Sequence, residues 1–118
     1  MRLSLNAFRK LGCLCGITER RISIPGGGSF LKDLFGVVDF LAIAGKDLIA
    51  VQCTSDINHN ARVKKAMALP EVKQWLHPES NRKLLIVTWK KVGSRWVNRG
   101  TQISLHQGKL KTSGFYLK

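Results

Sequence analysis

Acidic residues are scarce in this sequence. Its 118 residues include 7 Asp and Glu against 20 Lys and Arg, which gives a formal net charge of +13. So unbalanced a chain repels itself unless a polyanion binds it, and nucleic acid is the first candidate. A membrane surface is a weaker alternative, because the sequence has neither a basic amphipathic helix with a large apolar face nor a lipidation signal. The remaining alternative is a basic protein whose charge only keeps it soluble.

Cysteine is also sparse, and its count is odd. Cys13, Cys15 and Cys53 cannot all pair within one chain, and no charged segment leads into an apolar stretch of the signal-peptide type. We therefore expect a reduced, cytoplasmic protein. Cys13 and Cys15 lack the C-x-x-C spacing common in zinc sites, which argues against structural zinc.

Long apolar runs are missing as well. No run reaches the roughly 18 residues that a membrane-spanning helix needs, so we expect no membrane partner. The glycines at 26–28 are not followed by the Lys-Ser or Lys-Thr of a P-loop, which excludes that nucleotide site. Hydrophobic residues still make up 44% of the chain, enough for one folded domain. We expect a single domain over 1–118, with its core at about 6–91 and short strands and a tail over 92–118.

The residues that are present predict a mixture of helices and strands. Residues 6–20 carry apolar side chains at helical spacing, which predicts a helix. Residues 21–24 alternate between polar and apolar, which predicts a short strand that ends before Pro25. The chain after His106 is rich in Gly and Lys, and we expect it to be loosely held. The remaining elements follow from apolar runs and caps: helices at 58–69 and 70–76, a strand at 84–89, and short strands at 96–97 and 102–105.

Two apolar runs, 35–43 and 48–54, predict an antiparallel hairpin closed by Gly45-Lys46. Closing the turn there sets Asp39 directly across from Gln52 on one face of the pair. Thr54 should share that face, opposite Val37. A carboxylate and an amide inside strands of core character are costly unless something binds or pairs them.

The stretches "GITERR", "KDLFGVVDFLAI" and "LIAVQCTS", followed by a basic helix, resemble the PD-(D/E)XK nuclease superfamily, and in particular its small phage or prophage and Holliday junction resolvase-like members. The resemblance implies an α/β fold of restriction-endonuclease type, an αβββαβ core whose central mixed sheet of four or five strands is flanked by helices. It implies that Asp39 is the motif Asp, that Gln52 stands at the Glu position and that Glu19 is the acid of the first helix. Thr54 stands where the motif has Lys, so the usual E-x-K reads Q-x-T.

This resemblance implies a metal-dependent DNA endonuclease or resolvase, a homodimer, in the cytoplasm of a bacterial or phage-infected host cell. Hydrolysis of a phosphodiester needs a divalent ion, and hard oxygen ligands hold Mg²⁺ or Mn²⁺. The implied ligands are the side chains of Asp39, Gln52 and Glu19 and the backbone carbonyl of Cys53. Because Thr54 carries no charge, either a cationic side chain acts in its place, with Lys32, Arg62 and Lys65 as candidates, or catalysis is slow or absent.

Alternatives remain for each of these residues. If it has no functional role, Asp39 is a buried acid paired with Arg or Lys. Gln52 and Thr54 would then belong to an exposed strand face, and Glu19 would be an ion-paired residue at a helix end. If the protein is not a nuclease, it is a catalytically weak or inactive DNA-binding protein on a nuclease-like scaffold, or a basic domain that binds RNA or protein. His59 is either a general acid or, more commonly, a surface residue at a helix start, and Trp96 could stack on an unpaired base. Candidate phosphate contacts are the basic residues Lys32, Arg62, Lys64, Lys65, Lys90, Lys91, Arg95 and Arg99.

Overall fold

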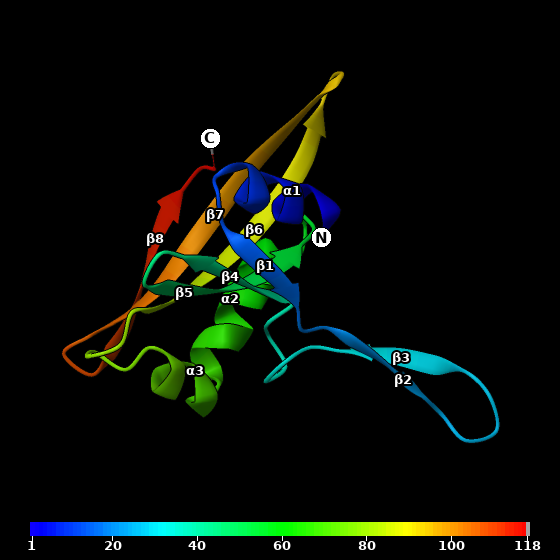
Figure 1. Cartoon of the computed structure of the whole chain (residues 1–118), viewed down its shortest axis with the longest axis horizontal. Helices are drawn as coiled ribbons and strands as arrows, with labels where there is room; N and C mark the ends of the chain where they lie inside the picture. The colour runs from blue at the N-terminus through cyan, green and yellow to red at the C-terminus, as the bar shows by residue number, and fades with distance from the viewer. Residues whose placement is uncertain (118) are drawn as a thin grey trace.

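The protein forms a mixed α/β fold, seen in a computed structural model that describes residues 1–117. Figure 1 shows a twisted sheet with helices on both faces and a slender hairpin that projects from it. The helices are α1 (Arg2–Lys10), α2 (His59–Ala68) and α3 (Pro70–Trp75). The strands are β1 (Leu14–Ile17), β2 (Arg20–Ser23), β3 (Ser29–Lys32), β4 (Phe40–Ala44), β5 (Asp47–Thr54), β6 (Arg82–Val92), β7 (Arg95–His106) and β8 (Lys109–Phe115).

Six of these strands form one mixed sheet in the order β1-β4-β5-β6-β7-β8. β5 and β6 run parallel and are joined by the α2–α3 crossover, whereas the other neighbours are antiparallel. β2 and β3 pair only with each other, as a separate two-stranded ribbon inserted between β1 and β4. The sheet is therefore larger than the four or five strands expected, and β7 and β8 extend it with the last part of the chain.

Alternation along the strands divides the core between the two faces of the sheet. Ala50 of β5 and Ile86 of β6 pack with Ala66 of α2 and Val72 of α3. Their neighbours in the sequence point to the other face, which is covered by α1: that cluster holds Leu5, Phe8, Phe40, Val51 and Val87. Period-two alternation of apolar residues on both faces is what a central strand covered by helices requires.

The β4–β5 hairpin has the expected turn and register. Ala44 pairs with Asp47 around Gly45-Lys46, and Phe40 pairs with Val51. Asp39 lies one residue before β4, where the ladder becomes irregular, because its backbone N–H donates to the carbonyl of Val51 at 2.9 Å. Val37 lies outside the strand, so the expectation that it opposes Thr54 is wrong. Thr54 instead pairs with Thr88 of β6.

The helix expected over 6–20 is wrong beyond Lys10. Gly12 adopts a φ of 91°, and the backbone N–H of Cys13 donates to the carbonyl of Phe8 at 3.0 Å. With the bond from the Gly12 N–H to the carbonyl of Arg9, also 3.0 Å, this closes α1 as a Schellman motif. The chain then forms β1 at the sheet edge, so Glu19 does not lie on a helix.

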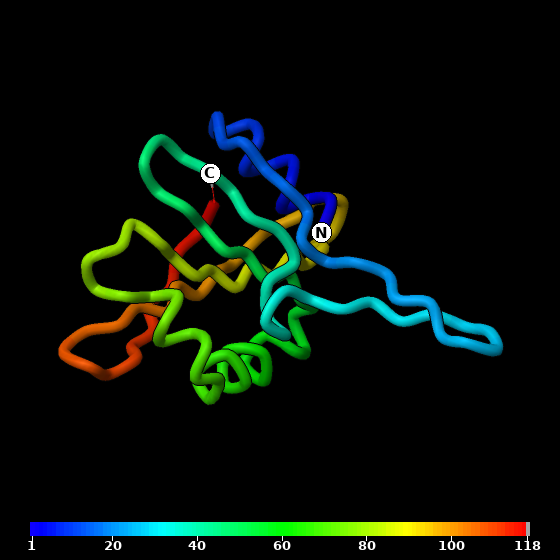
Figure 2. Tube along the Cα trace, turned by 60° about the horizontal axis from the view of Figure 1, so that its bottom comes forward, coloured from blue at the N-terminus to red at the C-terminus, as the bar shows by residue number. Residues whose placement is uncertain are grey.

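Residues 107–117 are not loosely held, contrary to expectation. β8 pairs with β7 along its length, and the Phe115 ring packs over Gly100. The side chain of Asn98 accepts a hydrogen bond from the backbone N–H of Leu117 at 2.7 Å and donates one to its carbonyl at 2.9 Å. Figure 2 shows this end of the chain running back along the sheet. Within residues 1–117, none of the helices has both the length and the apolar character needed to cross a membrane.

Candidate functional site

Three carboxylates converge at one end of the sheet. Glu19, Asp33 and Asp39 each offer an oxygen, and these oxygens all lie within 4.8 Å of one another. Glu19 directly precedes β2, Asp33 directly follows β3, and Asp39 directly precedes β4. The acidic cluster, as we call these three residues, thus lies where the β2–β3 ribbon leaves the sheet.

Asp39 is the buried and most constrained member, with 5% of its surface exposed. Its backbone carbonyl accepts the N–H groups of Thr18 at 2.9 Å and Glu19 at 3.0 Å. Its carboxylate oxygen Oδ2 accepts the backbone N–H of Cys53 at 2.7 Å, in the place of a ladder carbonyl. Asp39 therefore ties the segment that carries Glu19 to the end of β5.

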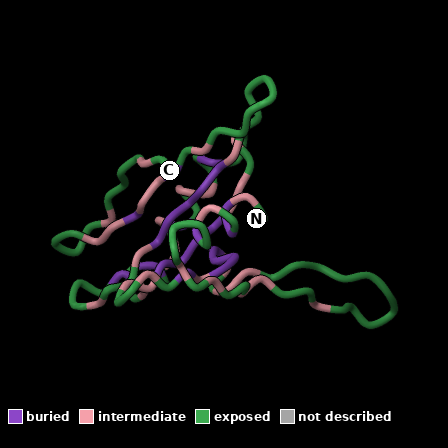
Figure 3. Tube along the Cα trace, turned by 45° about the horizontal axis from the view of Figure 1, so that its top comes forward, coloured by how far each residue is buried: buried purple, intermediate pink, exposed green. Residues whose placement is uncertain are grey.

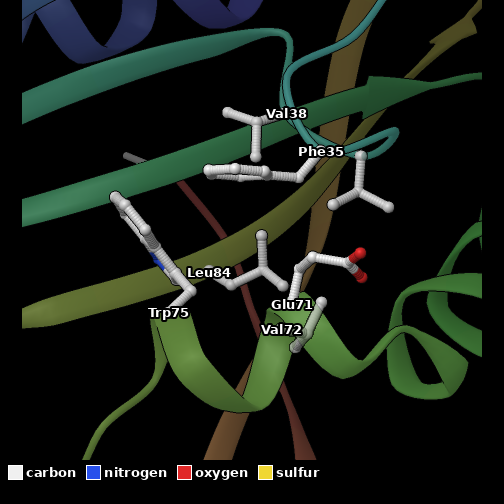
Figure 4. Close-up of a pocket in the computed structure, with 7 residues that line it drawn as sticks. Phe35, Val38, Glu71, Val72, Trp75 and Leu84 are labelled. Atoms are coloured by element: carbon white, nitrogen blue, oxygen red, sulfur yellow. The ribbon is translucent and has the colours of Figure 1, made fainter.

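The loop between Asp33 and Asp39 is anchored on α3. Phe35 and Gly36 take left-handed conformations, with φ of 54° and 77°, which explains why the strand expected over 35–43 begins only at Phe40. Figure 4 shows Phe35 and Val38 on one side of a small cavity and α3 on the other, with the Trp75 ring turned toward Phe35. The cavity measures about 10 Å³, no more than one water molecule needs, so it is a packing gap and not a ligand pocket.

The electrostatics of the cluster favour a cation. Burial, the neighbouring Asp33 and the charge of Glu19 together raise the pKa of Asp39 to about 7, against the opposing effect of the Cys53 N–H. Within residues 1–117, the salt bridges involve Asp47 and Asp56, and none of the three cluster carboxylates takes part in one. A carboxylate in this position is stabilised in its charged form when a cation binds beside it.

Gln52 is a second unusual polar group close by in the fold. The residue is 1% exposed, and its buried Oε1 atom has no hydrogen-bond partner among residues 1–117. Gln52 lies on β5 between Val51, whose carbonyl accepts the backbone N–H of Asp39, and Cys53, whose N–H donates to the Asp39 carboxylate. A buried amide oxygen without a donor costs free energy, and a bound cation or water would remove that cost.

The structure brings together two of the predicted site acids, Asp39 and Glu19, and adds Asp33, which sequence reasoning missed. The two acids meet because the register that pairs Arg20 with Lys32, continued by one residue, sets Glu19 opposite Asp33. The ribbon itself was not anticipated, because only its first strand was predicted. The roles of the Cys53 backbone carbonyl as a metal ligand and of the Thr54 side chain as a catalytic group stay predictions.

A surface hollow of about 540 Å³ adjoins the cluster at Asp33. It lies at the base of the ribbon, and two cations, Arg20 and Lys32, line it together with Thr18, Leu34 and Phe35. Positive side chains therefore flank the acidic cluster on the side that solvent can reach. This arrangement suits a ligand that carries negative charge and shares a metal ion with the carboxylates.

The other predicted basic residues are spread over two regions. Arg62, Lys64 and Lys65 lie on α2, while Lys91 and Arg95 lie exposed at the β6–β7 turn. Lys90 and Arg99 contact the carboxylate of Asp56 at 3.8 and 3.2 Å.

His59 is not a surface residue. Its ring is 2% exposed and hydrogen-bonds Thr88 through Nδ1 and Thr101 through Nε2, the latter at 2.8 Å. With both ring nitrogens engaged, His59 connects α2 to β6 and β7 inside the fold.

Comparisons of the chain with protein-family models, with curated proteins and with solved structures found no match.

Proposed function

We propose that the protein is a divalent-metal-dependent DNA nuclease of resolvase-like type. The observation that carries the proposal is the acidic cluster. In a chain with 20 Lys and Arg, three of the 7 acids gather within 4.8 Å of one another and form no salt bridge within residues 1–117. Mutual repulsion makes such a cluster unfavourable unless a proton or a bound cation offsets its charge, and a divalent cation is the partner that we propose.

The donor set fits Mg²⁺ or Mn²⁺. Glu19, Asp33 and Asp39 offer carboxylate oxygens, and the unpartnered amide oxygen of Gln52 lies on the neighbouring strand. Hard oxygen ligands of this kind suit these ions and leave coordination positions for water and a phosphate oxygen. A bound divalent ion would offset the negative charge that develops on the phosphate and lower the pKa of a bound water.

The order of elements supports the likeness to PD-(D/E)XK nucleases. A helix, an edge strand, a hairpin and a crossover to a parallel strand follow one another as α1, β1, β4–β5, α2–α3 and β6. Asp39 stands at the first strand of the hairpin and Gln52 near the end of the second. These are the positions at which the family has its Asp and its Glu or Gln.

The missing motif Lys finds its best substitute in Lys32. Lys32 lines the hollow beside Asp33, whereas Arg62 and Lys65 lie on α2. In this role Lys32 would orient the attacking water or hold the phosphate, as the motif Lys does. Arg20 on the opposite strand of the ribbon would bind a neighbouring phosphate.

A DNA-binding protein without cleavage activity is the second candidate. The observation that favours it is the pair of motif departures, because Gln52 and Thr54 remove one negative and one positive charge from the usual site. A site with fewer negative ligands binds a divalent ion less tightly.

A cleavage assay tests the proposal. Purified protein is incubated with linear, single-stranded and four-way-junction DNA in the presence of Mg²⁺ or Mn²⁺, and products are resolved on denaturing gels. We expect cleavage that falls at least about 100-fold in Asp39→Asn. Asp47→Asn is the matched control, because Asp47 lies at the β4–β5 turn and contacts Lys83 at 3.2 Å.

Absence of cleavage on every substrate with both ions contradicts the nuclease proposal and leaves the DNA-binding alternative. Equal loss in Asp39→Asn and Asp47→Asn contradicts the placement of the site. The same preparation, analysed by sedimentation, tests the homodimer that the resemblance implies.

A further inference from the structure

The β2–β3 ribbon, residues 20–32, projects from the body as a separate arm. Figure 1 shows it extending away from the sheet, with β2 in blue and β3 in cyan, and Figure 3 shows it almost entirely exposed. Of its paired positions only Ile22 is half-buried, and the others are exposed. Arg21 donates a hydrogen bond to the hydroxyl of Ser29 at 2.9 Å across the pair. An isolated two-stranded hairpin is marginally stable in water, so an arm of this kind is expected to have a partner.

The charge of the arm indicates what that partner is. Residues 20–32 contain three cations, Arg20, Arg21 and Lys32, and no acid. A second copy of the chain, with its own net charge of +13, would be repelled by them. The arm is therefore complementary to a polyanion.

The shape and apolar content of the arm favour a nucleic-acid groove. A two-stranded ribbon is one of the two elements that fit the major groove of B-DNA. Ile24 at the turn and Phe30 midway along β3 are 46% and 48% exposed, and Leu31, which pairs with Arg21 closer to the body, is 54% exposed. These side chains offer apolar contact to sugars or base edges. The cross-strand pair Arg20–Lys32 lies nearest the body, where it also borders the hollow at the acidic cluster.

We propose that this arm is a DNA-binding element that lies along a groove of duplex DNA. Arg20, Arg21 and Lys32 contact phosphates at its base, and Phe30 and Ile24, which lie farther toward its tip, enter the groove. The arm thereby leads the DNA backbone across the hollow to the acidic cluster. This inference rests on the DNA part of the proposed function and not on cleavage.

Binding without metal tests the arm separately from cleavage. Affinity for a fluorescein-labelled 30-base-pair duplex is measured by anisotropy in EDTA over a series of salt concentrations. We expect the variant Arg20→Gln/Arg21→Gln/Lys32→Gln to bind at least about tenfold more weakly, with a salt slope reduced by roughly two to three. The matched control is Lys46→Gln/Lys109→Gln/Lys111→Gln, which removes the same charge from exposed positions outside the arm. Equal weakening of the two variants overturns the proposal.

A photo-crosslinker placed at Phe30 supplies a second readout that does not depend on charge. We expect the irradiated protein to crosslink to the duplex. Crosslinking instead to a second copy of the chain or to anionic lipid vesicles, or no crosslink to DNA, overturns the proposal. Loss of affinity in the arm variant together with absent cleavage in the wild type refutes the nuclease function and leaves the arm inference standing.

Discussion

Glu19 and Asp33 face each other at the base of the β2–β3 arm, one residue beyond the pair formed by Arg20 and Lys32. Two like charges at the end of a ladder repel each other, and the nearby Asp39 adds a third. The arm is therefore joined to the sheet at a place where three carboxylates repel one another.

Divalent metal should stabilise the protein. If Mg²⁺ or Mn²⁺ binds the folded state only, a concentration about 100 times its dissociation constant adds roughly 2.7 kcal/mol to the free energy of unfolding. Thermal unfolding in EDTA and in added metal measures the difference, and we expect a rise of several degrees. Asp39→Asn should abolish the rise and Asp47→Asn should keep it. An equal rise in both variants would show that the ion binds elsewhere.

Asp39→Asn should stabilise the metal-free protein at high pH. The pKa of Asp39 is about 7 in the fold and near its ordinary 3.8 in the unfolded chain. The folded state therefore holds the proton more tightly, and this contribution to stability is fully present below about pH 3.8 and lost as the pH rises to about 7. Asparagine keeps an oxygen for the Cys53 N–H and carries no charge, so at pH 8 the variant should gain roughly 1–3 kcal/mol.

Denaturant unfolding in EDTA at pH 4 and pH 8 measures this effect. The gain should disappear at pH 4, where the wild-type carboxyl is protonated in the folded state. Because the same variant is expected to lose cleavage, a more stable but inactive protein is the combined signature of a functional acid. A variant that is less stable at pH 8 contradicts the prediction.

His59 should make the fold sensitive to acid. Burial, together with the nearby Arg99 and against the effect of Asp56, lowers its pKa from the ordinary 6.5. The folded state keeps the ring neutral, so its contribution to stability is present above about pH 6.5 and is lost as the pH falls below that value. His59→Gln should remove this contribution, so the unfolding free energy of the wild type relative to the variant should fall as the pH is lowered from 7 to 5. The control His106→Gln, at an exposed position, should retain the wild-type slope.

Gly100→Ala should destabilise the sheet through Phe115. A Cβ atom at position 100 would overlap the Phe115 ring, which packs directly over this glycine of β7. Displacing the ring from the core cluster that it joins should cost roughly 1–3 kcal/mol, measured by denaturant unfolding. Phe115→Leu in the same chain should recover part of the loss. A double-mutant cycle without coupling between the two positions argues against the contact.

The sequence predicted the central hairpin well and its surroundings less well. The turn at Gly45-Lys46 and the pairing of Phe40 with Val51 follow from local patterns alone, because a tight turn fixes the register of both strands. The predicted helix over 6–20 and the predicted strand over 35–43 were too long for a common reason. Gly12 and Phe35 adopt left-handed conformations, which hydrophobic periodicity does not predict. The C-terminal strand was missed because its stability comes from Phe115 and Asn98, whose partners lie far away in the sequence.

The candidate site was half predictable. Asp39 could be identified as an acid within an apolar run. Glu19 was predicted to lie near Asp39, which it does, but on a helix that the structure does not contain. Asp33 could be found only by recognising the arm, whose glycine-rich turn hides the pairing of Ser23 with Ser29. The charge state of Asp39 depends on burial and on carboxylates brought together in space, which no local pattern encodes.

The pairing of Arg20 with Lys32 also means that the chain leaves the body and returns to it at the same place. A peptide epitope or fluorescent label inserted at Gly27, where the backbone already has a φ of 123°, would hang from the distal end without altering the topology of the main sheet. The same geometry would let arms of different length or composition be grafted between Glu19 and Asp33. If the arm binds DNA as proposed, such grafts would change which DNA is bound while the rest of the fold stays the same.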